Sequence, residues 1–417
     1  MKKTNIAAAL SALLLSALLL LAGCGAASPA PAPTPAPEPT SAPTPEPTPT
    51  PFMEPVMEQG GSVYFDGREL PGGRRLCEGG EYVLLSEAAQ ALGSALEHGE
   101  GSGDFSFAWR KSAVELSAQS TQARYLDRER ELDAPPLLCS GGDDLLVPLE
   151  SFCAAAEIGY FYDEEPDAVY CSPAAGDWEL PENYAVPVLM YHDIGHAHGD
   201  PTANLILLPE TLEQQFAWLN ENGFTTIWFE DLWHVEDFEK PVILVFDDGY
   251  MSMYSYLLPL AEKYQIKAVV AIVEDFVNKD TLWHMNSDEV QALYDSGLIA
   301  LESHGVSHLD LSETWNVPDP EPEIRDSKLW LTRLFKKEPI VFVYPIGGST
   351  PAAQECVRQY YRFGVKMFGP AYNTSDDPTM VYRYFIEKQT PMSWYDSWLN
   401  GAFDDPSLNN YRPRSRG

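Results

Sequence analysis

The stretch Val242-Ile243-Leu244-Val245-Phe246-Asp247-Asp248-Gly249 decides the fold, because a run of apolar residues leads directly into two carboxylates and a glycine. A short, wholly apolar run of this kind is typical of a buried strand in a parallel sheet. Polar residues that directly follow such strands lie where folds of this class carry their functional sites. The stretch therefore predicts an α/β fold with its chemistry at the carboxyl ends of the strands.

Strands and helices alternate from Val186 onward. The sequence predicts strands over residues 186–190, 242–246, 268–273, 298–302, 340–344 and 363–367, and helices over 209–222, 252–264, 287–296, 321–336 and 351–361. Repeated βα units give a parallel sheet with right-handed crossovers. About seven units in roughly 210 residues favour a barrel over an open sheet.

Candidate functional residues follow four of these strands. They are Tyr191-His192-Asp193, Asp247-Asp248-Gly249, Ser303-His304 with His308, and Pro345-Ile346-Gly347. Adjacent aspartates at a strand end point in different directions, so one can bind a cation while the other stays free as a base. Two histidines four residues apart face the same way on a helical turn. Two imidazoles and a carboxylate leave open positions on a zinc-like ion, as catalytic metal sites do.

Three of these segments resemble known motifs. Val245–Gly249, Ser303–His308 and Tyr344–Gly347 are similar to the three leading motifs of the polysaccharide deacetylases, which form the NodB-homology family or carbohydrate esterase family 4. The likeness extends from about Val186 to Lys388. The resemblance implies a distorted (β/α) barrel and a divalent metal, with Zn²⁺ as the first expectation. It also implies a role for each motif residue: Asp247 as catalytic base, Asp248, His304 and His308 as metal ligands, and Ile346 and Tyr344 at the oxyanion and substrate position.

Three departures from the family pattern stand out. Gly305 occupies the position after the first metal histidine, where Ser or Thr is frequent, and Val343 replaces an arginine that orients the base. No histidine follows His308, although many members use a late histidine as general acid. The early run Leu189-Met190-Tyr191-His192-Asp193 resembles the poly-N-acetylglucosamine deacetylase branch, in which a histidine of this motif is the acid. His192 is therefore the expected general acid, protonated with the help of nearby carboxylates.

The expected reaction is hydrolysis of the acetyl group of N-acetylglucosamine-type residues in a cell-wall or extracellular polysaccharide. Such an enzyme belongs to the hydrolases that act on carbon–nitrogen bonds other than peptide bonds. Two alternatives stay open on the sequence. One is a catalytically inactive, glycan-binding lipoprotein of the cell surface, which the missing late histidine favours. The other is an O-acetyl esterase acting on xylan-like glycans, since the same residues would serve it.

The amino-terminal segment predicts export and a lipid anchor. Lys2 and Lys3 precede the apolar run 6–21, a pattern typical of a signal peptide. Leu21-Ala22-Gly23-Cys24 resembles the lipobox of bacterial lipoproteins, so residues 1–24 are expected to end at a lipidated Cys24. Two acyl chains anchor a protein stably. We expect the chain at the extracellular face of a bacterial plasma membrane, with the membrane and a polysaccharide as its partners.

Three further regions complete the predicted organisation. Residues 25–59 are rich in proline and form a semi-rigid linker. Residues 60–175 contain a faint repeat, in which strand-like segments 105–116 and 160–170 each follow a helix-like one, and resemble the copper-amine-oxidase-like N-terminal domain. This small α+β domain would act as a spacer or bind the wall. The deacetylase-like domain spans 186–390, and residues 391–417 are expected to be a carboxyl-terminal tail.

The charge balance excludes one class of partner. The chain has 62 acidic and 27 basic residues and a formal net charge of −35. Nucleic-acid binding depends on Lys and Arg that neutralise phosphates. We therefore expect no nucleic-acid partner.

Overall fold

The computed structural model describes residues 57–77, 79–99, 103–118, 120–196, 204–279, 282–313, 315 and 317–410. All of these belong to one unit, Glu54–Gly417. The predicted signal peptide, the lipobox with Cys24 and nearly all of the predicted linker lie outside the described residues. Among the residues that are described, no helix has both the length and the apolar character that crossing a bilayer requires.

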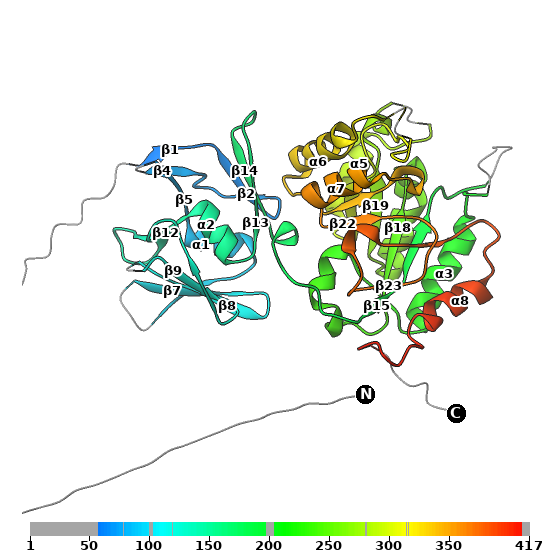
Figure 1. Ribbon diagram of the computed structural model, residues 1–417, viewed down its shortest axis with the longest axis horizontal. Coiled ribbons are helices and arrows are strands. Elements are labelled where there is room, and N and C mark those ends of the chain that lie inside the picture. Colours follow the sequence, from blue (N-terminus) through cyan, green and yellow to red (C-terminus); the bar gives the residue numbers. More distant parts are fainter. Residues whose placement is uncertain are drawn as a thin grey trace, which may run out of the picture. The chain divides into compact units, whose positions relative to one another are not determined.

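A parallel sheet forms the centre of the carboxyl-terminal part of the chain, and the predicted α/β arrangement is confirmed there (Figure 1). Its strands run in the order β22-β21-β20-β19-β18-β16-β24, with β17 beside β18. The strands are β16 (Val188–Tyr191), β17 (Thr225–Thr226), β18 (Pro241–Phe246), β19 (Ala268–Ile272), β20 (Ile299–Ser303), β21 (Val341–Val343), β22 (Phe363–Val365) and β24 (Tyr384–Phe385). Every residue of β16, β18 and β19 is buried, as expected of strands covered on both faces.

Helices connect these strands close to the predicted positions. They are α3 (Pro209–Glu221), α4 (Leu258–Tyr264), α5 (Ser287–Asp295), α6 (Glu321–Phe335) and α7 (Pro351–Tyr360), and one more helix, α8 (Met392–Gly401), follows the last strand. In α3 the side chains of Leu212, Phe216 and Leu219 are buried, which is the face that the spacing of apolar residues predicts. The helix predicted over 252–264 differs in its first half, where Met253–Leu257 is a π-helical segment.

The sheet is curled but open. Its edge strands are β22 and β24, and no pairing joins them in the described part of the chain. The structure is thus a half-barrel rather than the barrel we expected, although the carboxyl ends of the strands still meet at one edge. Strand β24, which the sequence did not reveal, pairs with β16 through Leu189↔Tyr384 and Met190↔Phe385.

The expected carboxyl-terminal tail is a second point of correction. Residues 392–401 form α8, and its Tyr395 and Leu399 are fully buried in the same hydrophobic core as the strands. The hydroxyl of Tyr395 lies 3.5 Å from that of Tyr191 at the end of β16. This helix is therefore part of the folded structure. Residues after 410 lie outside the described range.

The preceding part of the chain is a set of antiparallel sheets with two short helices. The sheets have the orders β1-β4-β5-β12-β11, β10-β9-β8-β7-β6 and β13-β14-β2-β3, the last with one parallel pair, β14–β2. Their elements are β1 (Glu58–Gln59), β2 (Ser62–Phe65), β3 (Arg68–Glu69), β4 (Arg75–Cys77), β5 (Gly80–Leu84), α1 (Leu85–Ala91), β6 (Leu96–His98), β7 (Asp104–Trp109), β8 (Ser112–Ser117), β9 (Gln122–Tyr125), β10 (Arg128–Glu131), β11 (Leu137–Leu138), β12 (Leu145–Pro148), α2 (Leu149–Ala155), β13 (Gly159–Asp163) and β14 (Ala168–Ser172). The repeat is visible as two strand–helix units, β5–α1 and β12–α2, whose strands pair with each other.

The strand-like segments of this part are hairpins. Residues 105–116 form most of β7–β8, and residues 160–170 form most of β13–β14. The part has a hydrophobic core of its own, drawn from residues between Val63 and Cys171. Its boundaries as a domain, and its likeness to the copper-amine-oxidase-like domain, stay predictions.

Candidate metal and catalytic site

The turn after β18 carries the two adjacent aspartates. Asp248 and Gly249 have left-handed backbone conformations, with φ of 76° and 70°. The chain turns sharply at the end of the buried strand, and the two carboxylates contact different neighbours. Asp247 and Asp248 are 2% and 8% exposed. Each buried charge therefore needs a specific partner.

Arg383 is the partner of Asp247. Its Nη1 and Nη2 atoms donate hydrogen bonds of 2.7 and 2.9 Å to the two carboxylate oxygens, while its Nε donates one of 3.0 Å to the carbonyl oxygen of Lys366. Burial opposes the ionisation of Asp247, but the charges of Arg383 and His304 outweigh it, so the pKa of Asp247 lies below its ordinary value. Asp247 is an ionised carboxylate held in one orientation, as a general base requires.

Sequence reasoning had Arg383 as a candidate neighbour of the site but did not place it beside the base. The family motif has an arginine at the position of Val343, and the structure instead supplies one from a segment that directly precedes β24. The only available signal was an arginine beside a two-residue apolar strand, which is too short to show a periodicity.

Asp248, His304 and His308 converge on one point. Oδ1 of Asp248 lies 3.4 Å from Nε2 of His304 and 3.2 Å from Nε2 of His308. One ligand atom from each residue lies within 4.8 Å of the other two. Although Oδ1 is buried, it forms no hydrogen bond. One carboxylate oxygen and two imidazole nitrogens that face each other in this way fit a divalent ion such as zinc.

The ring of His304 is oriented by the backbone of the neighbouring strand. Its Nδ1 lies 2.7 Å from the carbonyl oxygen of Val343, and a carbonyl can only accept, so Nδ1 carries the hydrogen and Nε2 faces Asp248. Burial opposes the ionisation of Asp248, but His304 and His308 outweigh it, and the pKa of Asp248 lies well below its ordinary value. Asp248 is therefore available as an anionic ligand.

The two histidines lie on a loop, and the expected helical turn was wrong. Gly305 and His308 both have left-handed conformations, with φ of 85° and 59°. The imidazole rings still approach each other, with 4.9 Å between their centroids. Their spacing correctly predicted that the two rings lie close together, but a tight loop rather than a helix brings them there.

His192 lies beside the base, at the end of β16. Its Nε2 is 4.0 Å from Oδ2 of Asp247, and its ring packs edge-on against Phe385. We expected nearby carboxylates to favour the protonated ring. That expectation was wrong, because burial outweighs Asp247 and Asp248, and the pKa of His192 lies below its ordinary value. The ring is mainly neutral near pH 7.

Tyr344 and Ile346 follow β21 but differ in exposure. The Tyr344 side chain is fully buried, and its hydroxyl lies 3.5 Å from the carbonyl oxygen of Thr379. Ile346 has a left-handed backbone with φ of 58°, and its side chain is 59% exposed. Only Ile346 therefore presents an accessible surface, and the roles of both residues stay predictions.

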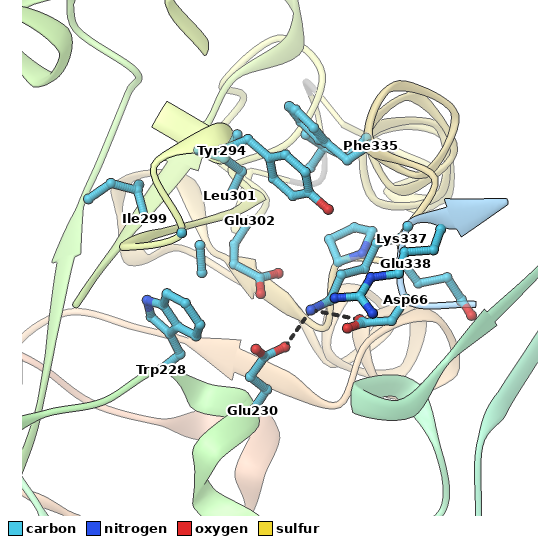
Figure 2. A pocket seen from close by; sticks show the side chains of 16 residues that line it. Asp66, Trp228, Glu230, Tyr294, Ile299, Leu301, Glu302, Phe335, Lys337 and Glu338 are labelled. Atoms are coloured by element: carbon cyan, nitrogen blue, oxygen red, sulfur yellow. Dashed lines mark hydrogen bonds and ion pairs between the residues drawn. The ribbon is translucent and has the colours of Figure 1, made fainter. Parts of the chain in front are cut away.

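A cavity of about 390 Å³ lies elsewhere in the structure, and Figure 2 shows its lining. Trp228 and Tyr294 contribute to its walls. Lys337 places its Nζ 2.8 Å from Glu230 and 3.0 Å from Asp66, so these charges compensate each other. The cavity adjoins Ile299, the first residue of β20, whereas the aspartates and histidines follow the last residues of their strands. It is therefore distinct from the candidate site.

Comparison with known sequences shows what this part of the chain is similar to. Residues 234–364 match the family described as polysaccharide deacetylase. YxkH of Bacillus subtilis (strain 168), assigned to the polysaccharide deacetylases, is 28% identical over 168 residues, which are 39% of this chain and 57% of YxkH. The poly-β-1,6-N-acetyl-D-glucosamine N-deacetylase of Escherichia coli (strain K12) is 30% identical over 123 residues, which are 25% of this chain and 17% of that protein.

The chain spans little more than half the length of YxkH and less than a fifth of the E. coli protein. Among solved structures, the Streptococcus pyogenes deacetylase PplD, in complex with acetate, is 22% identical with a TM-score of 0.48, covering 52% of this chain and 99% of that one.

Proposed function

We propose that this chain is a metal-dependent hydrolase that removes acetyl groups from N-acetylglucosamine-type residues of a cell-wall or extracellular polysaccharide. One observation carries the proposal. Asp247 directly precedes Asp248 of the Asp248–His304–His308 cluster, and its Oδ2 lies 4.0 Å from Nε2 of His192, at the edge of the sheet where functional sites of such folds occur. The name of the E. coli relative, a deacetylase of poly-N-acetylglucosamine, supports this class of substrate.

Each residue has a distinct task in the proposed reaction. A divalent ion held by Asp248, His304 and His308 would supply Lewis-acid chemistry that polarises the acetyl carbonyl and makes water more acidic. Asp247 accepts a proton from the water that attacks the carbonyl carbon, and Arg383 keeps its carboxylate in place. The backbone N–H of Ile346, with Tyr344 beside it, is the proposed donor to the developing oxyanion. His192 gives a proton to the departing nitrogen as the carbon–nitrogen bond breaks, so that acetate and a free amine leave.

Two other functions use the same residues. An inactive glycan-binding protein does not need a base with a dedicated arginine, so the Asp247–Arg383 pair argues for an enzyme. An O-acetyl esterase would need the same base and metal ligands. It would depend less on a general acid, because an alcohol leaves more easily than an amine. The position of His192 beside the base favours the amide.

We also propose where the enzyme works. A lipidated Cys24 would hold it at the outer face of a bacterial plasma membrane, and the proline-rich residues 25–59 would extend it from the lipid. The lipobox-like sequence supports this placement. Residues 60–175 would then serve as a spacer or bind the wall.

An acetate-release panel tests the proposed reaction. The full-length chain is incubated with peptidoglycan, N-acetylated β-1,4 and β-1,6 glucosamine polymers, and acetylxylan. We expect acetate from one or more of the N-acetylated polymers and none from the matched variant Asp247→Asn. Acetate from acetylxylan alone would favour the esterase, and no acetate from any polymer would favour the glycan-binding protein.

A further inference from the structure

Glu323, in the first turn of α6, binds the loop that carries both metal-binding histidines. Its Oε2 accepts hydrogen bonds from the backbone N–H groups of Val306 (3.1 Å) and Ser307 (2.9 Å), and its Oε1 accepts one of 2.6 Å from the hydroxyl of Ser307. Three hydrogen bonds to one carboxylate fix the middle of the loop. Hydrogen bonds to a charged acceptor are stronger than those between neutral groups.

The opposite side of the loop is held by a different element. The backbone N–H groups of Glu274 and Asp275, which follow β19, donate to the carbonyl oxygens of Gly305 (3.2 Å) and Val306 (2.8 Å). The loop thus accepts hydrogen bonds from the segment after β19 and donates hydrogen bonds to Glu323 of α6. Because buried backbone groups need partners, removal of Glu323 would leave two N–H groups of the loop without theirs.

The loop has a backbone conformation that hydrogen bonds from other parts of the chain must maintain. Gly305 and the ligand His308 both have positive φ, and for His308 this is an unfavourable region. Residues in such regions persist only when their surroundings hold them there. Glu323 bonds to the two residues that lie between Gly305 and the strained His308.

Gly305 makes room for Glu323. A β-carbon at position 305 would lie 3.3 Å from Oε2 of Glu323, closer than most such contacts. Position 305, where Ser or Thr is frequent in the family, is a glycine here. The absence of a side chain lets the Glu323 carboxylate lie close to the backbone. A second connection from the same helix reinforces the arrangement, since the hydroxyl of Ser327 lies 2.8 Å from that of Ser303, next to His304.

We propose that Glu323 is a positioning residue that sets the geometry of the metal ligands by holding the His304–His308 loop. The inference rests on the proposed function, because it concerns the metal site of that enzyme. Glu323 touches the loop backbone and not the ligating atoms, so it acts through His304 and His308.

Metal affinity of the full-length chain tests the inference without any substrate. Zn²⁺ affinity is measured by competition with a chromophoric chelator, and ligand geometry by the absorption spectrum of bound Co²⁺. We expect Glu323→Gln to weaken Zn²⁺ binding by about tenfold or more and to change the Co²⁺ spectrum, as loss of partners around a metal site does. Ser307→Ala removes one of the three bonds and should weaken Zn²⁺ binding by about fivefold. The double variant should be no weaker than Glu323→Gln alone.

Glu321→Gln is the matched control. Glu321 lies in the same first turn of α6 but contacts Tyr360 and Arg325 rather than the loop, so its variant loses the same charge near the helix end. We expect it to bind Zn²⁺ as the wild type does.

Unchanged affinity and spectrum in Glu323→Gln, or an equal loss in Glu321→Gln, would overturn the inference. If Glu323→Gln does not fold, unchanged affinity in Ser307→Ala overturns it. A wild type that binds Zn²⁺ but releases no acetate contradicts the proposed function alone.

Discussion

Arg383 and Asp247 are 136 residues apart in the sequence, yet they form a buried pair joined by two hydrogen bonds of 2.7 and 2.9 Å. Both side chains are almost completely removed from solvent. The guanidinium matches the two carboxylate oxygens in a fork geometry that a lysine cannot reproduce. This pair fixes both the charge and the direction of the proposed base.

Arg383→Ala should impair both stability and catalysis. Removing one partner of a buried ion pair typically costs about 3–5 kcal/mol, because the other charge stays buried. Without Arg383 the pKa of Asp247 rises, so the acid limb of the kcat/KM profile should move to higher pH. Arg383→Lys should keep part of the charge effect but lower kcat. Arg358→Ala, which breaks an exposed pair with Asp377, is the control, and its cost should stay below about 1 kcal/mol. An acid limb that does not move would contradict the role of Arg383.

The two adjacent aspartates should respond differently to substitution. Asp248→Ala, His304→Ala and His308→Ala should each lose bound metal and activity together, because each removes a ligand. Asp247→Asn should retain the metal but lose turnover, since an amide does not accept the proton from water. Metal content by elemental analysis and acetate release distinguish the two classes. Equal metal loss in Asp247→Asn and Asp248→Ala would contradict this division of roles.

His192→Ala should retain the fold and the metal but lose amide hydrolysis by about a hundred- to ten-thousand-fold, the usual contribution of a general acid. It should lose much less on an activated ester, whose leaving group departs without a proton. In the wild type, burial lowers the pKa of His192, so amide hydrolysis should decline as pH rises through a value below the ordinary 6.5. Equal rates of His192→Ala and wild type on both substrates would show that another residue is the acid.

Glu302→Gln should stabilise the protein at alkaline pH. Burial and the nearby Glu230 raise the pKa of Glu302 from 4.5 to about 8, although Val341 and Ile340 donate backbone hydrogen bonds to its carboxyl group. Between these values the unfolded chain ionises while the folded one stays protonated, so wild-type stability falls as pH rises. Urea unfolding at pH 5 and pH 8.5 should show the gain of the variant mainly at pH 8.5. Glu355→Gln, at an exposed position, should show no such difference. A gain equal at both pH values would contradict the assignment.

Cys24→Ala should release the protein from the membrane. The two acyl chains that we propose for Cys24 would anchor the chain stably, and the variant would lack both. Fractionation of the native host, followed by immunoblotting, should find the wild type with membranes and the variant in the soluble fraction. Finding the wild type in the soluble fraction would contradict the lipid anchor.

The parallel sheet could be predicted because its strands are buried on both faces. Residues 242–246 and 268–272 contain only apolar residues, so their limits are visible in the sequence, and polar residues mark where the strands end. The same reasoning failed for β24, which has two residues and no pattern. Arg383 could not be placed for that reason. Its role depends on the pairing of β24 with β16, a contact between distant parts of the chain.

Turns explain the other errors. The hairpin β7–β8 turns at Arg110, which has a φ of 49° and none of the glycine or asparagine signals that mark such turns. The sequence therefore shows a strand-like segment there but not the turn within it. The spacing of His304 and His308 indicated that both could bind one metal ion, but it did not indicate a loop. Glu323 and the residues after β19 determine the loop conformation through tertiary contacts.

The pairing of β16 with β24 gives the site an order of completion during synthesis. A growing chain contains both aspartates and both histidines once residue 308 is made, but Arg383 and Phe385, which pack on Asp247 and His192, come 75 or more residues later. An incomplete polypeptide therefore has its metal ligands while its base lacks the arginine that orients it. In the proposed enzyme hydrolytic competence is acquired last, and loss of the chain beyond a cut between residues 308 and 383 would remove the arginine without removing a single ligand.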